Sequence, residues 1–153
     1  MLNQYTIENL YDLNETIAAP MFEAPVYPWE LLPKISEFIK KLGASLPTDK
    51  YTQIMENVWV SNSATIAPTA YICGPAIIDD EAEIRHCAFI SGNDIVGKGG
   101  VVGNSTELKN VILFNKVQVP HYNYVGDSIL GFKAHMGDVS ITSHVKSDTP
   151  LVT

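Results

Sequence analysis

The chain has 153 residues, of which 46% are hydrophobic, and this size and composition predict one globular domain, or one domain with an appendage, that can bury a core. Its formal net charge of −7 argues against nucleic acid or an anionic membrane as the main partner, because both favour a basic surface. A small anionic ligand remains compatible with this charge, since it needs only a local cation.

The two cysteines, Cys73 and Cys87, form no C-x-x-C motif and are too few for a disulfide framework. The first 16 residues lack the basic and apolar regions of a signal peptide, and no apolar run approaches the ~20 residues of a membrane-spanning helix. We therefore expect a cytoplasmic protein with reduced thiols and no membrane partner.

Residues 1–50 are expected to form a helical N-terminal segment. "TIENLYDLNETI" has apolar residues near helical spacing, and "PWELLPKISEFIKKLG" has a stronger apolar face. That face consists of Leu31, Leu32, Ile35, Phe38, Ile39 and Leu42. Pro33 is expected in the first turn of this helix, and Gly43 is expected to end it. The apolar faces need a partner, so this segment should pack on the rest of the chain.

From Val60 onward the period of the sequence changes to six. The recurring aliphatic or aromatic residues are Val60, Ile66, Ile72, Ile78, Ile84, Ile90, Val96, Val102, Leu108 and Phe114. No α-helix has this period, whereas a short strand followed by a sharp corner does. Three such sides close a triangular coil of 18 residues, and coils stack about 4.8 Å apart through strand hydrogen bonds. Residues 51–153 are therefore predicted to form a parallel β-helix, with Pro120 in the place of an eleventh inward residue. An ordinary sandwich would need ten coincidental matches.

This repeat resembles that of the hexapeptide-repeat proteins, which form left-handed parallel β-helices. The left-handed winding is implied by the resemblance alone, because crossover connections are usually right-handed. The resemblance also implies a homotrimer with binding sites between neighbouring subunits.

An 18-residue coil would stack residues 18 apart into columns. The expected columns are Cys73, Ser91, Lys109 and Asp127; Arg85, Gly103 and His121; and Ile77, Ile95 and Leu113. In the second column Arg85 and His121 would lie roughly 10 Å apart. They could hold an anion between them, although an exposed arginine beside a small residue gives the same pattern. The third column is an aliphatic stripe that either the N-terminal segment or a second subunit must cover.

The four histidines are His86, His121, His135 and His144. Zinc-binding relatives with this type of helix, the γ-class carbonic anhydrases, have two histidines about five residues apart and a third from a neighbouring coil, and this spacing is absent here. No metal site is therefore predicted. Cys73 and Cys87 fall on different faces without an obvious base, which favours packing roles. His121 is either a surface residue or a general base that takes a proton from an amine or hydroxyl attacking a thioester.

The stretch "VVGNSTELKNVILFNKVQVPHYNYVGDSILG" resembles the acetyltransferase domain of the bifunctional N-acetylglucosamine-1-phosphate uridyltransferases. It also resembles short proteins of a helix-plus-β-helix layout that are described as nucleotidyltransferase-like. The matching features are Gly103-Asn104, Glu107, Lys109, His121, Tyr124 and Gly126-Asp127. This resemblance implies that His121 is the catalytic base, that Lys109 contacts the sugar phosphate and that Tyr124 and Asn104 contact substrate. It further implies acetyl-CoA as the co-substrate and a sugar phosphate or nucleotide sugar as the small-molecule partner.

The chain also departs from that family. Ser91 occupies the place of an arginine that grips the phosphate together with the lysine, and His144 replaces part of an Asn-Tyr pair. The sequence stops at Thr153, before the coils that the family uses for acetyl-CoA, so a shortened β-helix is expected. Two hypotheses follow. The chain is an acetyltransferase-like protein with Lys109, Ser91 and Arg85 near its substrate, or it is a binding or scaffold protein that kept the pocket without turnover.

Overall fold

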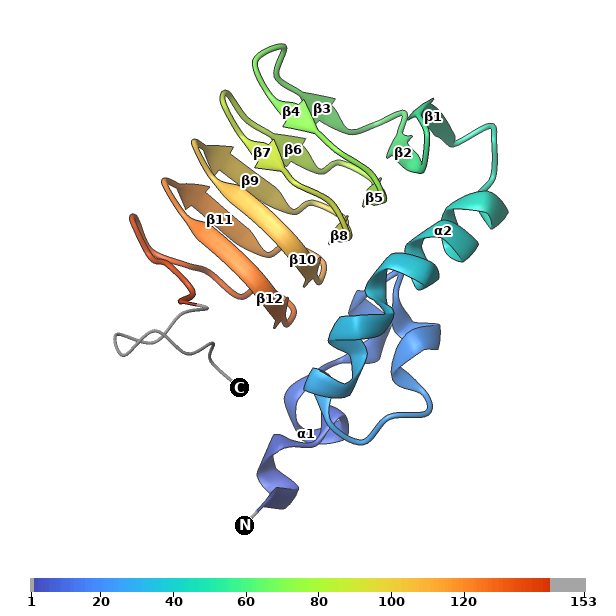
Figure 1. Ribbon diagram of the computed structural model, residues 1–153, viewed down its shortest axis with the longest axis vertical. Helices are drawn as coiled ribbons and strands as arrows, with labels where there is room; N and C mark the ends of the chain where they lie inside the picture. The colour runs from blue at the N-terminus through green and yellow to red at the C-terminus, as the bar shows by residue number, and fades with distance from the viewer. Residues whose placement is uncertain (1, 144–153) are drawn as a thin grey trace.

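The computed structural model describes residues 2–143 and divides them into a helical N-terminal segment and a β-helix (Figure 1). The N-terminal elements are the 3-10 helices η1 (Leu2–Tyr5), η2 (Leu13–Glu15), η3 (Ala19–Phe22) and η4 (Pro28–Lys34), and the α-helices α1 (Ile7–Leu10) and α2 (Ile35–Ser45). No helix in residues 2–143 is long and apolar enough to cross a membrane.

Twelve strands follow in the described part of the chain. They are β1 (Tyr51–Met55), β2 (Val58–Ser61), β3 (Thr65–Ile66), β4 (Tyr71–Ile72), β5 (Ala76–Ile78), β6 (Glu83–Ile84), β7 (Phe89–Ile90), β8 (Asp94–Val96), β9 (Val101–Asn104), β10 (Glu107–Leu113), β11 (Gln118–His121) and β12 (Tyr124–Leu130). β1 and β2 form an antiparallel hairpin, and the other pairings are parallel. The sequence analysis did not predict this hairpin, in which Asn57 takes a positive φ at the turn.

The parallel strands build the three faces of a prism, which confirms the predicted β-helix. Face 1 contains β2, β5, β8 and the second halves of β10 and β12. Face 2 contains β3, β6, β9 and β11. Face 3 contains β4, β7 and the first halves of β10 and β12. Inward aliphatic side chains from all three faces fill the core.

The coil length changes once along the chain, and this corrects the predicted columns. Val58, Ala76 and Asp94 are 18 residues apart in register, but Val111 and Ser128 follow at 17. The corner between faces 3 and 1 loses a residue at Lys109-Asn110, where the coil above has Ser91-Gly92-Asn93. The inward positions after Leu108 are therefore Leu113, Val119 and Val125, all fully buried, and the prediction of Phe114 and Pro120 for this series is wrong.

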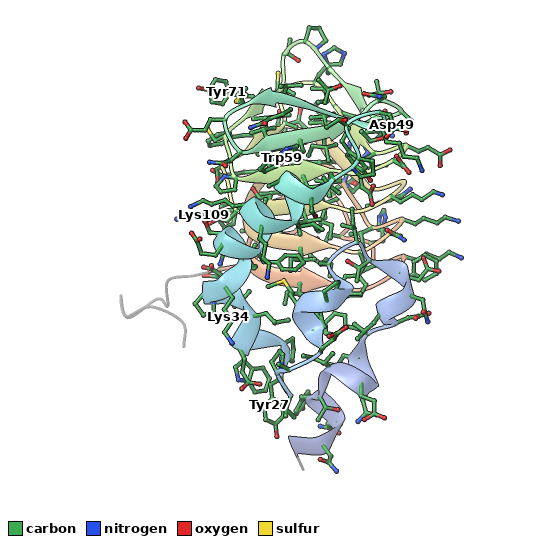
Figure 2. The ribbon with its side chains drawn as sticks, turned by 90° about the vertical axis from the view of Figure 1, so that its right-hand side faces the viewer. Tyr27, Lys34, Asp49, Trp59, Tyr71 and Lys109 are labelled. Carbon is green, nitrogen blue, oxygen red and sulfur yellow. The ribbon has the colours of Figure 1, made fainter. Side chains whose placement is uncertain are left out.

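The N-terminal segment covers face 1, which settles what covers the aliphatic stripe. The outward column of face 1 is Trp59, Ile77, Ile95, Ile112 and Ile129, so Ile112 stands where Leu113 was predicted. Helix α2 packs across β5, β8 and β10, and Figure 2 shows Trp59 beneath it. Ile77, Ile95 and Ile112 are consequently fully buried within one chain.

Three predictions for the N-terminal segment need correction. Pro33 lies inside the 3-10 helix η4 and not in the first turn of α2, which begins at Ile35. Gly43 does not end α2, which runs on to Ser45, and a Cβ at this position would collide with the ring of Trp59. The helix predicted for "TIENLYDLNETI" lasts only four residues, because Tyr11 adopts an extended conformation. The ring of Tyr11 then forms a three-ring cluster with Phe22 and Phe114, and its hydroxyl donates to the Ile129 carbonyl at 3.0 Å.

Candidate functional site

The predicted site residues Lys109 and Tyr124 lie on neighbouring strands of face 3. Glu107 and Lys109 point outward from β10, and their register partners on β12 are Tyr124 and Gly126. Gly126 therefore stands where the predicted column had Asp127. Lys109 and Tyr71, which lie two coils apart on this face, appear on the same side of the molecule in Figure 2.

Tyr124 leans along its strand toward Lys109. A Cβ on Gly126 would stand 2.7 Å from the Tyr124 hydroxyl oxygen and 2.9 Å from a ring carbon, so the ring lies directly over Gly126. Because Gly126 is the register partner of Lys109, the tyrosine hydroxyl lies beside the lysine on the same outward surface. The missing side chain at position 126 thus leaves room for the Tyr124 hydroxyl next to the strand position of Lys109.

The surroundings of Tyr124 favour its neutral phenol form. Burial, followed by the negative charges of Glu107, Asp127 and Asp94, raises the pKa of Tyr124 above its ordinary value of 10.0. A neutral phenol can donate a hydrogen bond to a ligand oxygen at physiological pH.

Lys109 is exposed, and within residues 2–143 its ammonium group makes no hydrogen bond or ion pair. Ser91 lies one coil above it, and the Ser91 hydroxyl donates to the Leu108 carbonyl at 2.8 Å. The position of the family's arginine is therefore filled by a short neutral group that already has a partner. Among residues 2–143, Lys109 is the side chain that supplies positive charge at this point of the face.

Arg85 lies on face 2, and its guanidinium pairs with Glu83 at 2.9 Å. The register corrects the column proposed for it: His121 pairs with Asn104, while Gly103 approaches the backbone of Pro120. Arg85 and His121 thus belong to neighbouring columns, and the predicted open space at Gly103 is occupied by backbone.

His121 is exposed at the corner between faces 2 and 3, where a buried asparagine fixes its backbone. Asn123 accepts a hydrogen bond from the His121 N–H at 3.0 Å, and its amide donates to the carbonyls of Gly137 and Ser140 at 2.8 and 3.1 Å. Asn123 is only 3% exposed. The sequence analysis missed this residue, because an asparagine beside a corner looks like an ordinary turn residue.

Asn104 lies one coil above His121 on the same corner. Its side-chain oxygen accepts from the Ser105 hydroxyl at 2.9 Å, and its amide donates to the Tyr122 hydroxyl at 3.5 Å. His121 precedes Tyr124 by three residues and Lys109 follows Glu107 by two, so His121 and Lys109 approach face 3 from opposite corners. A ligand touching both would span most of the width of the face.

Two buried carboxyl groups were also missed from sequence. Asp94 is fully buried and accepts hydrogen bonds from the N–H groups of Gly92 and Val111, each at 3.0 Å. Burial raises the pKa of Asp94 to about 8, against the effect of these two donors. Asp79 accepts from the Tyr51 hydroxyl at 2.6 Å, and burial likewise raises its pKa. Both groups hold corners of the coil together.

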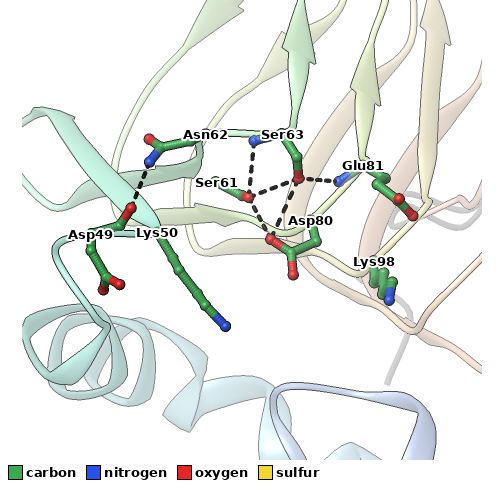
Figure 3. Close-up of a pocket in the computed structure, with 8 residues that line it drawn as sticks. All are labelled: Asp49, Lys50, Ser61, Asn62, Ser63, Asp80, Glu81 and Lys98. Atoms are coloured by element: carbon green, nitrogen blue, oxygen red, sulfur yellow. Dashed lines mark hydrogen bonds between the residues drawn. The ribbon is translucent and has the colours of Figure 1, made fainter.

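A polar cavity of about 290 Å³ lies at the opposite end of the prism (Figure 3). It is lined by Asp49, Lys50, Ser61, Asn62, Ser63, Asp80, Glu81 and Lys98. The hydroxyls of Ser61 and Ser63 donate to Asp80, and Lys50 and Lys98 extend on either side of that carboxylate in Figure 3. The hydroxyls already have partners, and a carboxylate between the lysines opposes an anion, so this cavity is not a phosphate site.

Among residues 2–143, no group of three or more histidine, cysteine or acidic side chains is arranged to hold a metal ion. His144, which the sequence analysis considered as a substitute for the family's asparagine, lies outside the described residues.

Comparisons with known proteins show which family profile matches this chain and which proteins have a similar sequence. The family profile of the GMPPB C-terminal domain matches residues 72–147. The Bifunctional protein GlmU of Methanococcus maripaludis (strain C5) is 33% identical over 124 residues, which cover 80% of this chain and 30% of that protein. The protein of the same name from Methanococcus vannielii is 32% identical over 128 residues, covering 82% of this chain and 31% of the relative.

The chain belongs to the left-handed β-helix superfamily of hexapeptide-repeat proteins. The resemblance to the bifunctional uridyltransferases is confirmed, and the residues matched by the family profile include Lys109, His121 and Tyr124. This hexapeptide-repeat chain spans only about 30% of the length of the GlmU relatives.

Proposed function

We propose that this chain is a sugar-phosphate acetyltransferase-like protein that binds an amino-sugar phosphate or a nucleotide sugar on face 3, with acetyl-CoA as the acyl donor. The relation to the GlmU proteins supports this class of function. The observation that carries the proposal is the placement of the Tyr124 hydroxyl over Gly126, the register partner of Lys109 on the neighbouring strand.

Each proposed role follows from the chemistry of the side chain. The ammonium group of Lys109 binds the phosphate of the substrate, because it is the free cation of this face within the described residues. The protonated Tyr124 hydroxyl donates to a substrate oxygen. Asn104, next to His121 on the corner, offers an amide to the same ligand. Ser91 borders the site one coil above Lys109, and Arg85 lies in the same coil as Ser91 but on face 2, where it pairs with Glu83.

His121 acts as the general base. Its neutral imidazole takes a proton from the sugar amine as the nitrogen attacks the thioester carbonyl. The N–C bond of the amide forms, the C–S bond breaks, and the thiolate of CoA leaves and takes up a proton. His121 is exposed, so its imidazole is accessible to a ligand. The hydrogen bond from its backbone N–H to Asn123 fixes the position of its backbone.

A second candidate function is binding without turnover. The Ser91 hydroxyl is already bonded to Leu108, so one cation of the family's phosphate grip is absent. In this case the chain would hold a sugar phosphate at Lys109 and Tyr124 as a binding or scaffold protein.

A homotrimer is part of the proposal. Tyr71 is 67% exposed and contacts Phe89 on face 3, whereas face 1 is covered by the N-terminal segment. His121 and Lys109 lie on an open surface, so a second copy packed against face 3 would enclose them. Such packing would bury the exposed aromatic side chains and exclude water from the site.

The test is release of CoA thiol from acetyl-CoA in the presence of glucosamine 1-phosphate. The wild type should turn over, and His121→Ala should be slower by about 10²-fold or more, as expected for loss of a general base. His135→Ala is the matched control, because His135 is also exposed but lies on the edge of face 2. Equal rates for the wild type and His121→Ala would contradict the catalytic role.

Calorimetry with the same sugar phosphate separates the two candidates. Saturable binding without any thiol release, in the wild type and in the His121→Ala variant alike, supports the binding protein. Absence of binding and of thiol release would contradict both.

A further inference from the structure

A cavity separate from the proposed catalytic residues lies in the seam between the N-terminal segment and the β-helix. It has a volume of about 180 Å³ and is lined by Tyr11, Pro28, Trp29, Leu32, Asp127 and Ile129. We propose that this cavity binds a single pyranose ring, with the C–H face of the sugar against Trp29 and a sugar hydroxyl donating to Asp127. This inference does not depend on the proposed function.

The aromatic wall is exposed and held in place. Trp29 is 51% exposed, although a tryptophan is normally buried to a large extent. The Tyr27 ring stacks on the Trp29 ring at 4.6 Å between centroids and an interplanar angle of 4°. The Glu30 carboxylate accepts the N–H groups of Val26 and Tyr27 at 2.9 and 2.7 Å, which fixes the start of η4. Tyr27 covers one face of the Trp29 ring, so the opposite face is the preformed surface that remains for stacking.

The polar wall is fixed by a link between the two parts of the molecule. The Asn110 amide donates to Asp127 Oδ1 at 2.8 Å and to the Leu32 carbonyl at 3.1 Å, which ties η4 to the corner of the β-helix. Asp127 is exposed, and its Oδ2 accepts no hydrogen bond from residues 2–143. The Tyr11 hydroxyl donates to the Ile129 carbonyl, so its oxygen also remains an acceptor.

The chemistry of these walls selects the ligand. Apart from the Trp29 indole N–H, the polar groups that remain open are acceptors, so a fitting ligand must bring donors, and the negative charge of Asp127 opposes a phosphate. The volume is below the ~300–1,000 Å³ of ordinary ligand pockets, which limits the ligand to one ring. A pyranose meets all three conditions, because it combines an apolar C–H face with hydroxyl donors around its edge.

The two tryptophans of the chain provide a test with an internal reference. In a ¹H–¹⁵N spectrum of the full chain each indole N–H gives one signal, and Trp59 is only 8% exposed beneath α2. Titration with methyl β-glucopyranoside should shift the Trp29 signal saturably, with a dissociation constant in the millimolar range, and leave the Trp59 signal unchanged. The Trp29→Ala variant identifies the signals by losing one of them.

Variants should show whether the polar wall contributes to the affinity for the sugar. Asp127→Asn should weaken binding roughly tenfold, as for loss of a charge-assisted hydrogen bond. Asparagine tolerates the positive φ of 44° at this position, so the corner should stay folded. Tyr71→Ala removes an exposed aromatic ring on another face and should leave the affinity unchanged.

Three outcomes would overturn the proposal. These are no saturable shift of the Trp29 signal, an equal shift with glycerol, which has hydroxyls but no ring face, and a shift with tetramethylammonium but not with the sugar. The result is independent of the catalytic proposal, because neither His121 nor Lys109 lines the cavity. His121→Ala should bind the sugar as the wild type does.

Discussion

Gly126 shows how a single residue shapes the proposed site. The Tyr124 ring occupies the space that a side chain at position 126 would need. The backbone of Gly126 does not have a positive φ, so alanine suits its conformation and the consequence of substitution falls on the tyrosine.

We predict that Gly126→Ala displaces the Tyr124 hydroxyl and weakens sugar-phosphate binding to the level of Tyr124→Phe, roughly tenfold, with little loss of stability. The hydroxyl end of a tyrosine can swing away at small cost, so the fold should persist. Calorimetry and thermal unfolding measure the two effects. Wild-type affinity in Gly126→Ala would show that Tyr124 does not contact the ligand.

The buried carboxyl of Asp94 makes the stability depend on pH. Burial raises the pKa of Asp94 to about 8, whereas an unfolded aspartate titrates near ~3.9. Between these values the folded chain holds a proton that the unfolded chain has released, so the free energy of unfolding should fall as pH rises from about 4 to 8.

We predict that Asp94→Asn reduces this slope by up to about 1.4 kcal/mol per pH unit, the contribution of one proton. Urea unfolding at pH 5 and pH 7 measures it. A smaller slope of the same sign should remain, because burial also raises the pKa of Asp79. An unchanged slope in Asp94→Asn would show that Asp94 is ionised in the folded chain throughout this range.

The sequence predicted some of the residues of the candidate site and missed others. Lys109, His121 and Tyr124 were predicted as site residues because the stretch around them resembles the acetyltransferase domain of the bifunctional uridyltransferases. Asn123 and Asp94 were not, since small polar residues are common at corners and only the structure shows that their side chains are buried and bonded.

At the level of elements, a glycine allows helix α2 to pack closely on face 1. Gly43 is buried against the ring of Trp59, and the two positions are far apart in sequence. Glycine costs a helix interior about 1 kcal/mol relative to alanine, so its presence indicates that close approach outweighs helix propensity here.

We predict that Gly43→Ala destabilises the chain by about 1–3 kcal/mol through overpacking, although alanine favours the helix itself. The reverse change one residue later is the control. Ala44→Gly, at an exposed position, should cost only the propensity difference of about 1 kcal/mol. Increased stability of Gly43→Ala in urea unfolding would contradict the packing of α2 on Trp59.

The period of six predicted the strands and corners of the β-helix, because it follows directly from side-chain direction on short strands. The one-residue shortening at Lys109-Asn110 escaped prediction. Phe114 and Pro120 are both apolar and fit an unbroken period of six, so they were predicted to point inward. In the structure Leu113 and Val119 occupy the inward positions instead. The early helix was overestimated because Tyr11 is extended at its C-terminal end and packs against Phe114, a contact distant in sequence.

At the scale of the whole molecule, the prism has unequal faces. The N-terminal segment covers face 1, and exposed aromatic residues remain on face 3. We predict a homotrimer, with a mass in light scattering of three times the 16.8 kDa chain. Tyr71→Glu should shift the mass toward one chain, and Ile54→Glu, on the β1 hairpin, should not. A wild-type protein that remains a single chain at micromolar concentration would contradict this assembly.

The central claim is that face 3 recognises a sugar phosphate through Lys109, and it applies to both candidate functions. Calorimetric titration with glucosamine 1-phosphate tests it most directly, using Lys109→Ala and, as the control, Lys116→Ala at an exposed corner away from this face. We predict saturable binding that weakens about tenfold or more, about 1.4 kcal/mol, in Lys109→Ala and stays unchanged in Lys116→Ala. Equal affinities in the wild type and in Lys109→Ala would contradict the claim.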